Sequence, residues 1–129
     1  METRLARRLK IGRKAVLRID KNSQQSFSLA KGNSLKVDMF DISVLGVGIR
    51  TKYFLPKGLI VHLEINGVLF GLAKPMKVKG EIRHCEQIDT YIYKCGVKFL
   101  NISKGHKDSI SQLIATHERR TVPRLKLPE

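Results

Sequence analysis

The chain has 129 residues, the size of one domain, because domains most often contain roughly 100–150 residues. It carries 25 Lys and Arg against 11 Asp and Glu, a formal net charge of +14, so its field favours anionic partners such as nucleic acid, nucleotides, phospholipid headgroups or an acidic protein. Hydrophobic residues make up 42% of the chain, which is enough for a core and excludes a disordered basic tail. No apolar run approaches the roughly 18–20 residues of a membrane helix, so we expect no membrane span.

The N-terminal sequence METRLARRLK is basic and is not followed by an apolar stretch, which argues against a secretory signal and favours the cytoplasm. Cys85 and Cys95 are ten residues apart on segments that we expect to be neighbouring strands. A disulfide is geometrically conceivable, but two reduced thiols are the favoured interpretation for a cytoplasmic protein. The spacing of cysteines and histidines resembles no zinc motif, so we expect neither a metal site nor a cofactor.

Basic residues crowd the first fourteen positions, where only Glu2 opposes them. Such a block repels itself, and we expect residues 1–10 to form a mobile, solvated N-terminal arm. The members of the block are Arg4, Arg7, Arg8, Lys10, Arg13 and Lys14.

Short β-rich runs then alternate with turn signals at intervals of about ten residues, the pattern of a small antiparallel sheet or barrel. Asn66-Gly67 is the strongest hairpin signal, since both residues tolerate positive φ, and Pro56-Lys57-Gly58 predicts another turn. The expected strands cover 15–19, 26–30, 35–40, 47–49, 59–65, 68–72, 78–82 and 91–99, with turns at 43–46 and 87–90.

The period of the hydrophobic residues changes from that of a strand to that of a helix near the end of the chain. Ile110, Leu113, Ile114 and His117 have the spacing of one helix face. We therefore predict a fold dominated by β structure, a small six-stranded antiparallel β-barrel with one C-terminal α-helix. The barrel domain is expected over 11–120 and a tail over 121–129.

The segment Asp41-Ile42-Ser43-Val44-Leu45-Gly46 lies between two expected strands. Asp41 and Ser43 are two apart, so in an extended segment both side chains point to one face and can reach one ligand. Gly46 permits a tight turn or the close approach of a ligand. An ordinary Asx or Ser turn, in which both side chains bond their own backbone, is the alternative.

The arm offers a second element. Arg4 and Arg8 are four apart and Arg7 lies between them. Guanidinium groups bond bidentately to phosphate or to the O6/N7 edge of guanine, and they stack on purines. A solubilising arm without a specific ligand is the alternative.

Together these elements resemble the PilZ domain family of cyclic di-GMP receptors. The resemblance rests on an R-x-x-x-R arm, a first strand, a D-x-S-x-x-G segment that opens a strand, and a closing helix. It extends from about Arg4 to Arg120, nearly the whole chain.

The resemblance implies that Arg4 and Arg8 grip the guanine edges and phosphates of cyclic di-GMP, with Arg7 included in the site. It implies that Asp41 and Ser43 bond a guanine and nearby ligand groups, and that Gly46 keeps the surface open. Independently of the resemblance, our hypothesis is that ligand binding folds the arm across the barrel and creates a surface for a downstream protein partner.

The register of the arginines is open, because Arg8 and Arg13, five apart, form an alternative pair. The pair Arg4 and Arg8 is preferred, since Leu9 to Ile19 then fits the approach to the first strand. Arg83 and Lys98 are expected to enrich a basic rim.

Two functions compete. The first is a non-enzymatic receptor that binds cyclic di-GMP and signals to a protein. The second is a basic β-barrel that binds nucleic acid non-specifically, which the scattered lysines favour but which needs no D-x-S-x-x-G segment. An enzyme is the least expected class, because no triad, P-loop or carboxylate dyad is visible. The sequence leaves open one or two ligand molecules, and a monomer or a homodimer.

Overall fold

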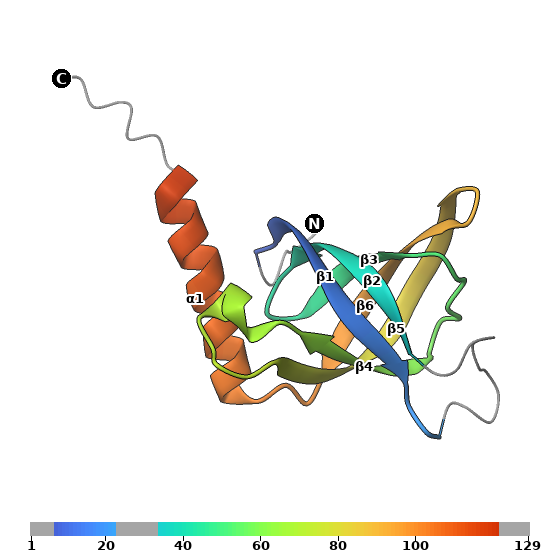
Figure 1. The fold of residues 1–129 in the computed structure, drawn as a ribbon, viewed down its shortest axis with the longest axis horizontal. Helices are drawn as coiled ribbons and strands as arrows, with labels where there is room; N and C mark the ends of the chain where they lie inside the picture. Colours follow the sequence, from blue (N-terminus) through green and yellow to red (C-terminus); the bar gives the residue numbers. More distant parts are fainter. Residues whose placement is uncertain (1–6, 23–33, 122–129) are drawn as a thin grey trace, which may run out of the picture.

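The computed structural model describes residues 7–22 and 34–121. They fold into a closed antiparallel barrel of six strands with one long helix at its C-terminal end (Figure 1), which confirms the predicted fold class. The elements are β1 (Leu9–Ile19), β2 (Ser34–Ile42), β3 (Gly46–Thr51), β4 (Ile60–Ile65), a 3-10 helix η2 (Gly67–Phe70), β5 (Met76–Asp89), β6 (Ile92–Leu100) and α1 (Lys104–Thr121).

The barrel closes in the order β1-β2-β3-β6-β5-β4, so β1 pairs with both β2 and β4. This order places β3 beside β6, although β4, η2 and β5 lie between them in the sequence. Gly48 lies directly opposite Gly96 in that pair. The two glycines leave space that the rings of Phe40 and His84 occupy.

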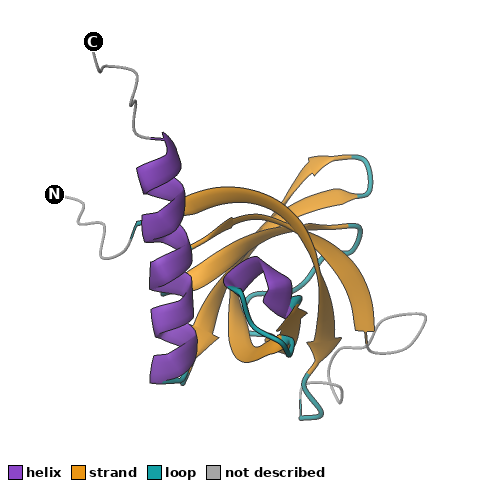
Figure 2. Cartoon of the chain, turned by 60° about the vertical axis from the view of Figure 1, so that its left-hand side comes forward, coloured by secondary structure: helices purple, strands orange, loops and turns teal. Residues whose placement is uncertain are grey.

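The core consists of the alternate, inward-facing residues of each strand. On β2, Val37 and Met39 are buried, as the apolar alternation of this segment predicts. On α1, Ile110 and Ile114 are buried with them. Figure 2 shows α1 standing along one side of the barrel with η2 beside it at the barrel opening.

β1 begins at Leu9, six residues before the Ala15 expected from the β-rich run, so the last two residues of the expected arm lie in a strand. The reason is pairing and burial, because Leu9 is buried in the core and lies opposite Ile42. The turn between β5 and β6 is also tighter than expected, since β5 continues to Asp89.

The hairpin predicted at Asn66-Gly67 is wrong, because no strand occupies 68–72. Asn66 has φ −56° instead of a positive φ, and its side chain accepts a hydrogen bond from the N–H of Val68. It therefore caps η2. Leu69, Phe70 and Leu72 are half-buried against the core, and this packing overrides the local turn preference. β4 still pairs with β5, with Ile65 opposite Met76, across a longer connection.

The expected strand over 26–30, Arg4 in the arm and nearly all of the expected tail lie outside the described residues. Within the described ranges, no helix combines the length and apolar character that a membrane crossing requires.

Candidate functional site

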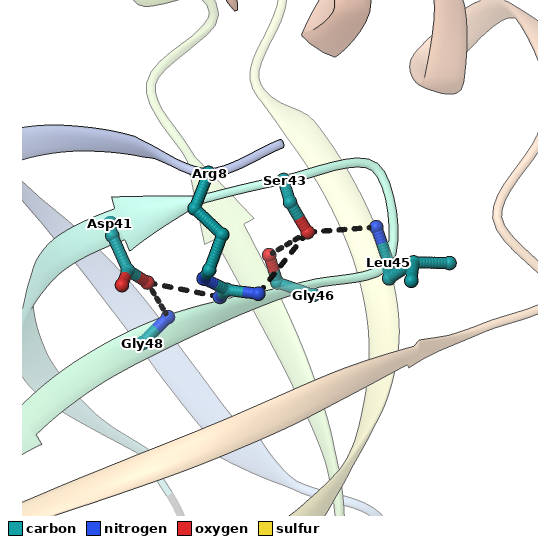
Figure 3. A network of polar contacts seen from close by, with 6 residues as sticks. All are labelled: Arg8, Asp41, Ser43, Leu45, Gly46 and Gly48. Atoms are coloured by element: carbon teal, nitrogen blue, oxygen red, sulfur yellow. Dashed lines mark hydrogen bonds and ion pairs between the residues drawn. The ribbon is translucent and has the colours of Figure 1, made fainter. Parts of the chain in front are cut away.

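Arg8 connects the start of the chain to the turn between β2 and β3. Its guanidinium donates to Oδ1 of Asp41 at 2.9 Å and to Oγ of Ser43 at 3.3 Å (Figure 3). The structure therefore brings together Arg8, Asp41 and Ser43, which the sequence had placed in one site. A guanidinium carries five N–H donors, so Arg8 retains donors for a ligand after making these two bonds.

Asp41 and Ser43 also satisfy the backbone around them. Oδ1 of Asp41 accepts from the N–H of Gly48 at 2.9 Å, and Oγ of Ser43 accepts from the N–H of Leu45 at 3.1 Å (Figure 3). The Asx or Ser turn that we considered as an alternative to a ligand site is thus present. The contacts of Asp41 and Ser43 to Arg8 are present as well. Both of the hydrogen bonds described for Asp41 use Oδ1.

Gly46 is required for packing. A Cβ atom at this position would lie 2.2 Å from the carbonyl oxygen of Val97 on β6, too close for any side chain. Gly48 makes room for side chains instead, because its Cβ would lie 2.5 Å from the Phe40 ring and 2.6 Å from Oδ1 of Asp41. The two glycines thus let β3 lie against β6 and against the carboxylate of Asp41.

These residues border an open pocket of about 540 Å³ on the outer face of β3, β6 and β5. Backbone of Gly46, Gly48 and Gly96 contributes to its lining, and the rings of Phe40 and His84 lie over Gly48 and Gly96, where a Cβ atom would approach them to 2.5 and 2.3 Å. Side chains around it include Arg8, Phe40, Asp41, Arg83, His84, Lys94 and Lys98.

The pocket is rich in positive charge. Four cationic side chains line it, from Arg8, Arg83, Lys94 and Lys98, whereas Asp41 is the one carboxylate in the lining. Arg83 is paired with Glu81 at 3.3 Å, and the amine of Lys94 lies 5.1 Å from the centroid of the Phe40 ring, within cation–π range. The arrangement favours an anion that also has flat, polarisable parts.

The remaining predicted residues have different outcomes. Arg7 is exposed and does not line the pocket, and Arg4 lies outside the described residues. Arg13, the alternative partner of Arg8, donates to the carbonyl of Gly12 and lines a separate groove beside α1. The geometry therefore places Arg8 but not Arg13 next to Asp41. Arg83 and Lys98 lie on the rim, as expected.

Sequence reasoning missed Phe40, His84 and Lys94 as pocket residues. The signal for Phe40 was available, because it occupies an outward position of an alternating strand. His84 and Lys94 belong to β5 and β6, and which outward residues of these strands meet β3 depends on a register that one sequence does not reveal.

Among the described residues, no group of three or more His, Cys, Asp or Glu side chains is placed to hold a metal ion. The pocket instead combines arginine and lysine side chains, one carboxylate and glycine backbone. The fold that carries it, a six-stranded barrel with a C-terminal helix, was compared with known proteins.

The PilZ domain family matches residues 2–116, and the chain belongs to this family. No curated protein matches. Among solved structures, the PilZ domain of YcgR from Escherichia coli with c-di-GMP has a TM-score of 0.64 at 16% identity, covering 98% of this chain and 100% of that chain.

The inhibitor of motility MotI/DgrA from Bacillus subtilis has a TM-score of 0.69 at 11% identity, over 95% of this chain and 55% of that chain. The complex of MrkH with c-di-GMP from K. pneumonia has a TM-score of 0.62 at 17% identity, over 94% and 57% respectively. The chain thus spans about half the length of these two proteins, and the similarity establishes the fold.

Proposed function

We propose that this PilZ domain is a receptor for cyclic di-GMP, a binding module and not an enzyme, and that it acts in the cytoplasm. The observation that carries the proposal is the contact of Arg8 with both Asp41 and Ser43 at the edge of a cationic pocket. The structures of YcgR and MrkH with c-di-GMP support the same ligand class.

The chemistry of the cluster suits a guanine base. Guanine presents N–H donors on one edge and the O6 and N7 acceptors on another. In the proposed complex Oδ2 of Asp41 accepts from the N–H groups, while Arg8 donates to O6 and N7 or to a phosphate. Each such charge-assisted bond contributes about 1.5–3 kcal/mol.

The rest of the pocket suits the phosphates and the second face of the ligand. Lys94, Lys98 and Arg83 surround a glycine-lined surface and oppose the two negative charges of the ligand. Arg4 and Arg7 are expected to add further contacts from the arm, by the family resemblance.

We propose that the output passes to an acidic protein partner, since the chain carries a formal charge of +14. Exposed aromatic side chains mark the docking surface, with Phe54 51% and Tyr91 74% exposed. Phe54 packs edge-on against Tyr93 with ring centroids 6.1 Å apart, which connects the loop after β3 to β6. Such aromatic side chains are enriched among residues that dominate protein interfaces.

A combined Phe54→Ser and Tyr91→Ser variant is expected to keep its nucleotide affinity and to lose proximity labelling of the partner in cells. Val68→Ser provides the control, because Val68 is 78% exposed on η2. Equal labelling by both variants would contradict this surface.

Isothermal titration of the purified chain tests whether cyclic di-GMP is the ligand. Cyclic di-GMP is expected to bind, while GTP and a short single-stranded oligonucleotide at moderate salt release little heat. Salt-sensitive binding of the oligonucleotide without binding of cyclic di-GMP would contradict the proposal and favour the alternative function, non-specific binding of nucleic acid. Absence of binding by all three would leave a domain that acts through protein contacts alone.

A further inference from the structure

The two cysteines face each other across β5 and β6. Cys85 lies directly opposite Cys95 in the antiparallel pair, and their Sγ atoms are 2.9 Å apart. Opposed residues of antiparallel strands have Cα atoms about 4.5–5.5 Å apart, within the range that a disulfide spans. Joining the two sulfur atoms therefore requires only a small movement of the side chains.

The two thiols have different surroundings. Cys95 is fully buried, whereas Cys85 is half-buried and keeps some access to solvent. The sulfur of Cys85 accepts from the thiol of Cys95 and from the N–H of Leu55 at 3.4 Å. Cys85 is therefore the thiol that a disulfide in solution can reach.

We propose that Cys85 and Cys95 form a dithiol site that low-molecular-weight disulfides, such as glutathione disulfide, convert to an intramolecular disulfide. The Cys85 thiolate attacks one sulfur of glutathione disulfide, and the first glutathione thiolate leaves. The Cys95 thiolate then attacks the Cys85 sulfur and displaces the second glutathione. The protein loses two electrons and two protons, and one glutathione disulfide becomes two glutathione thiols.

The order of these steps follows from access and acidity. The small-molecule disulfide reaches Cys85 first, because Cys95 is fully buried. Burial, together with the neighbouring Cys85, raises the pKa of the Cys95 thiol above its ordinary value, so Cys95 deprotonates with difficulty and closure is the slow step. Closure is expected to accelerate as the pH is raised from neutral to alkaline.

The site does not depend on the proposed nucleotide. Cys95 contributes to the pocket lining between Lys94 and Gly96, so the disulfide would lie under the pocket floor. It would covalently fix the spacing of the two strands that carry Lys94 and His84. The reaction is measurable whether or not cyclic di-GMP binds.

The experiment uses the full reduced chain, treated with excess glutathione disulfide, quenched with acid and measured by intact mass. The expected product is a monomer that has lost two hydrogen atoms, has no thiol available for alkylation after denaturation, and is restored by dithiothreitol. Cys95→Ser is expected to stop at a stable adduct of one glutathione, and Cys85→Ser to remain largely unreacted, because its remaining thiol is buried.

Other outcomes would overturn the proposal. These are a lasting glutathione adduct on the wild-type chain, a disulfide-linked dimer, or two thiols that still alkylate after denaturation. Circular dichroism of each variant shows whether the barrel is folded, so that a loss of reaction is not mistaken for a loss of structure.

Discussion

Arg8 and Asp41 each serve the fold and the proposed ligand through different atoms. Oδ1 of Asp41 binds Arg8 and the N–H of Gly48, and the proposed guanine contact uses Oδ2. Arg8 then remains oriented by Oδ1 when the guanine binds. Such prior orientation lowers the entropic cost of binding.

Asp41→Ala is expected to weaken binding of cyclic di-GMP by about 10- to 100-fold, the equivalent of one charge-assisted bond. Isothermal titration measures the change. Asp38→Ala is the matched control, because Asp38 also lies on β2 and pairs with a basic residue, Lys14, away from the pocket. Equal losses in the two variants would show that charge alone, and not the position of Asp41, governs binding.

Gly46→Ala is expected to destabilise the barrel by about 1–3 kcal/mol, because its Cβ would collide with the Val97 carbonyl. Thermal unfolding should show a melting temperature several degrees lower. Gly105→Ala is the control, since a Cβ there meets nothing within 4 Å and alanine suits a helix. An unchanged melting temperature for Gly46→Ala would contradict the packing role.

At this scale the sequence predicted that Arg8, Asp41 and Ser43 would lie close together, and they are in contact. Their proximity could be predicted because motif spacing is visible in one chain, and their role toward a ligand stays a prediction. The packing role of Gly46 could not, since its close neighbour Val97 belongs to a strand far along the chain.

Among the elements, β1 and β4 are joined near the end of β1 by a polar side-chain pair. His62 on β4 lies 2.7 Å from Asp20, measured from Nε2 to Oδ1. The hydrogen bond with His62, helped by the N–H of Asn22, lowers the pKa of Asp20 below its ordinary value. A lowered carboxyl pKa stabilises the fold above the ordinary pKa, and this contribution is lost as the pH falls through the folded-state value.

His62→Ala should raise the pKa of Asp20 toward its ordinary value, as measured by NMR titration of the carboxyl group. Urea unfolding should show that the variant is less stable than wild type at neutral pH, with a gap that narrows in acid as Asp20 becomes protonated. His106→Ala on α1 serves as the control. A gap that stays constant with pH would show that Asp20 does not carry the effect.

The elements themselves were largely predictable where one face is buried. The alternation over 35–40 and the helical spacing of Ile110 and Ile114 reflect burial, so pattern and structure agree. The prediction of a hairpin at Asn66-Gly67 was wrong, because the turn preference of these two residues is local, whereas Leu69 and Phe70 pack half-buried against the core. β1 and β5 are also longer in the structure than predicted, because pairing with strands that are distant in the sequence extends their ends.

At the scale of the whole molecule, the strand order assembles the site. β6 lies between β3 and β5 in the sheet, so residues far apart in the sequence meet on one face, and the pairing of β1 with β2 and β4 closes the same sheet into a barrel. The formal charge of +14 is spread over the chain and attracts any anion, whereas the face of β3, β6 and β5 brings four of the cationic side chains together with Asp41 and glycine backbone.

The NMR signals of the glycine backbone amides give the most direct measurement of where the ligand binds. In a ¹⁵N-edited NMR titration with cyclic di-GMP, the amides of Gly46, Gly48 and Gly96, which line the pocket, are expected to shift. Those of Gly12 and Gly105, which lie outside it, are expected to stay in place. Shifts confined to Gly12, or no shift at saturating ligand, would contradict the assignment of this face as the cyclic di-GMP site.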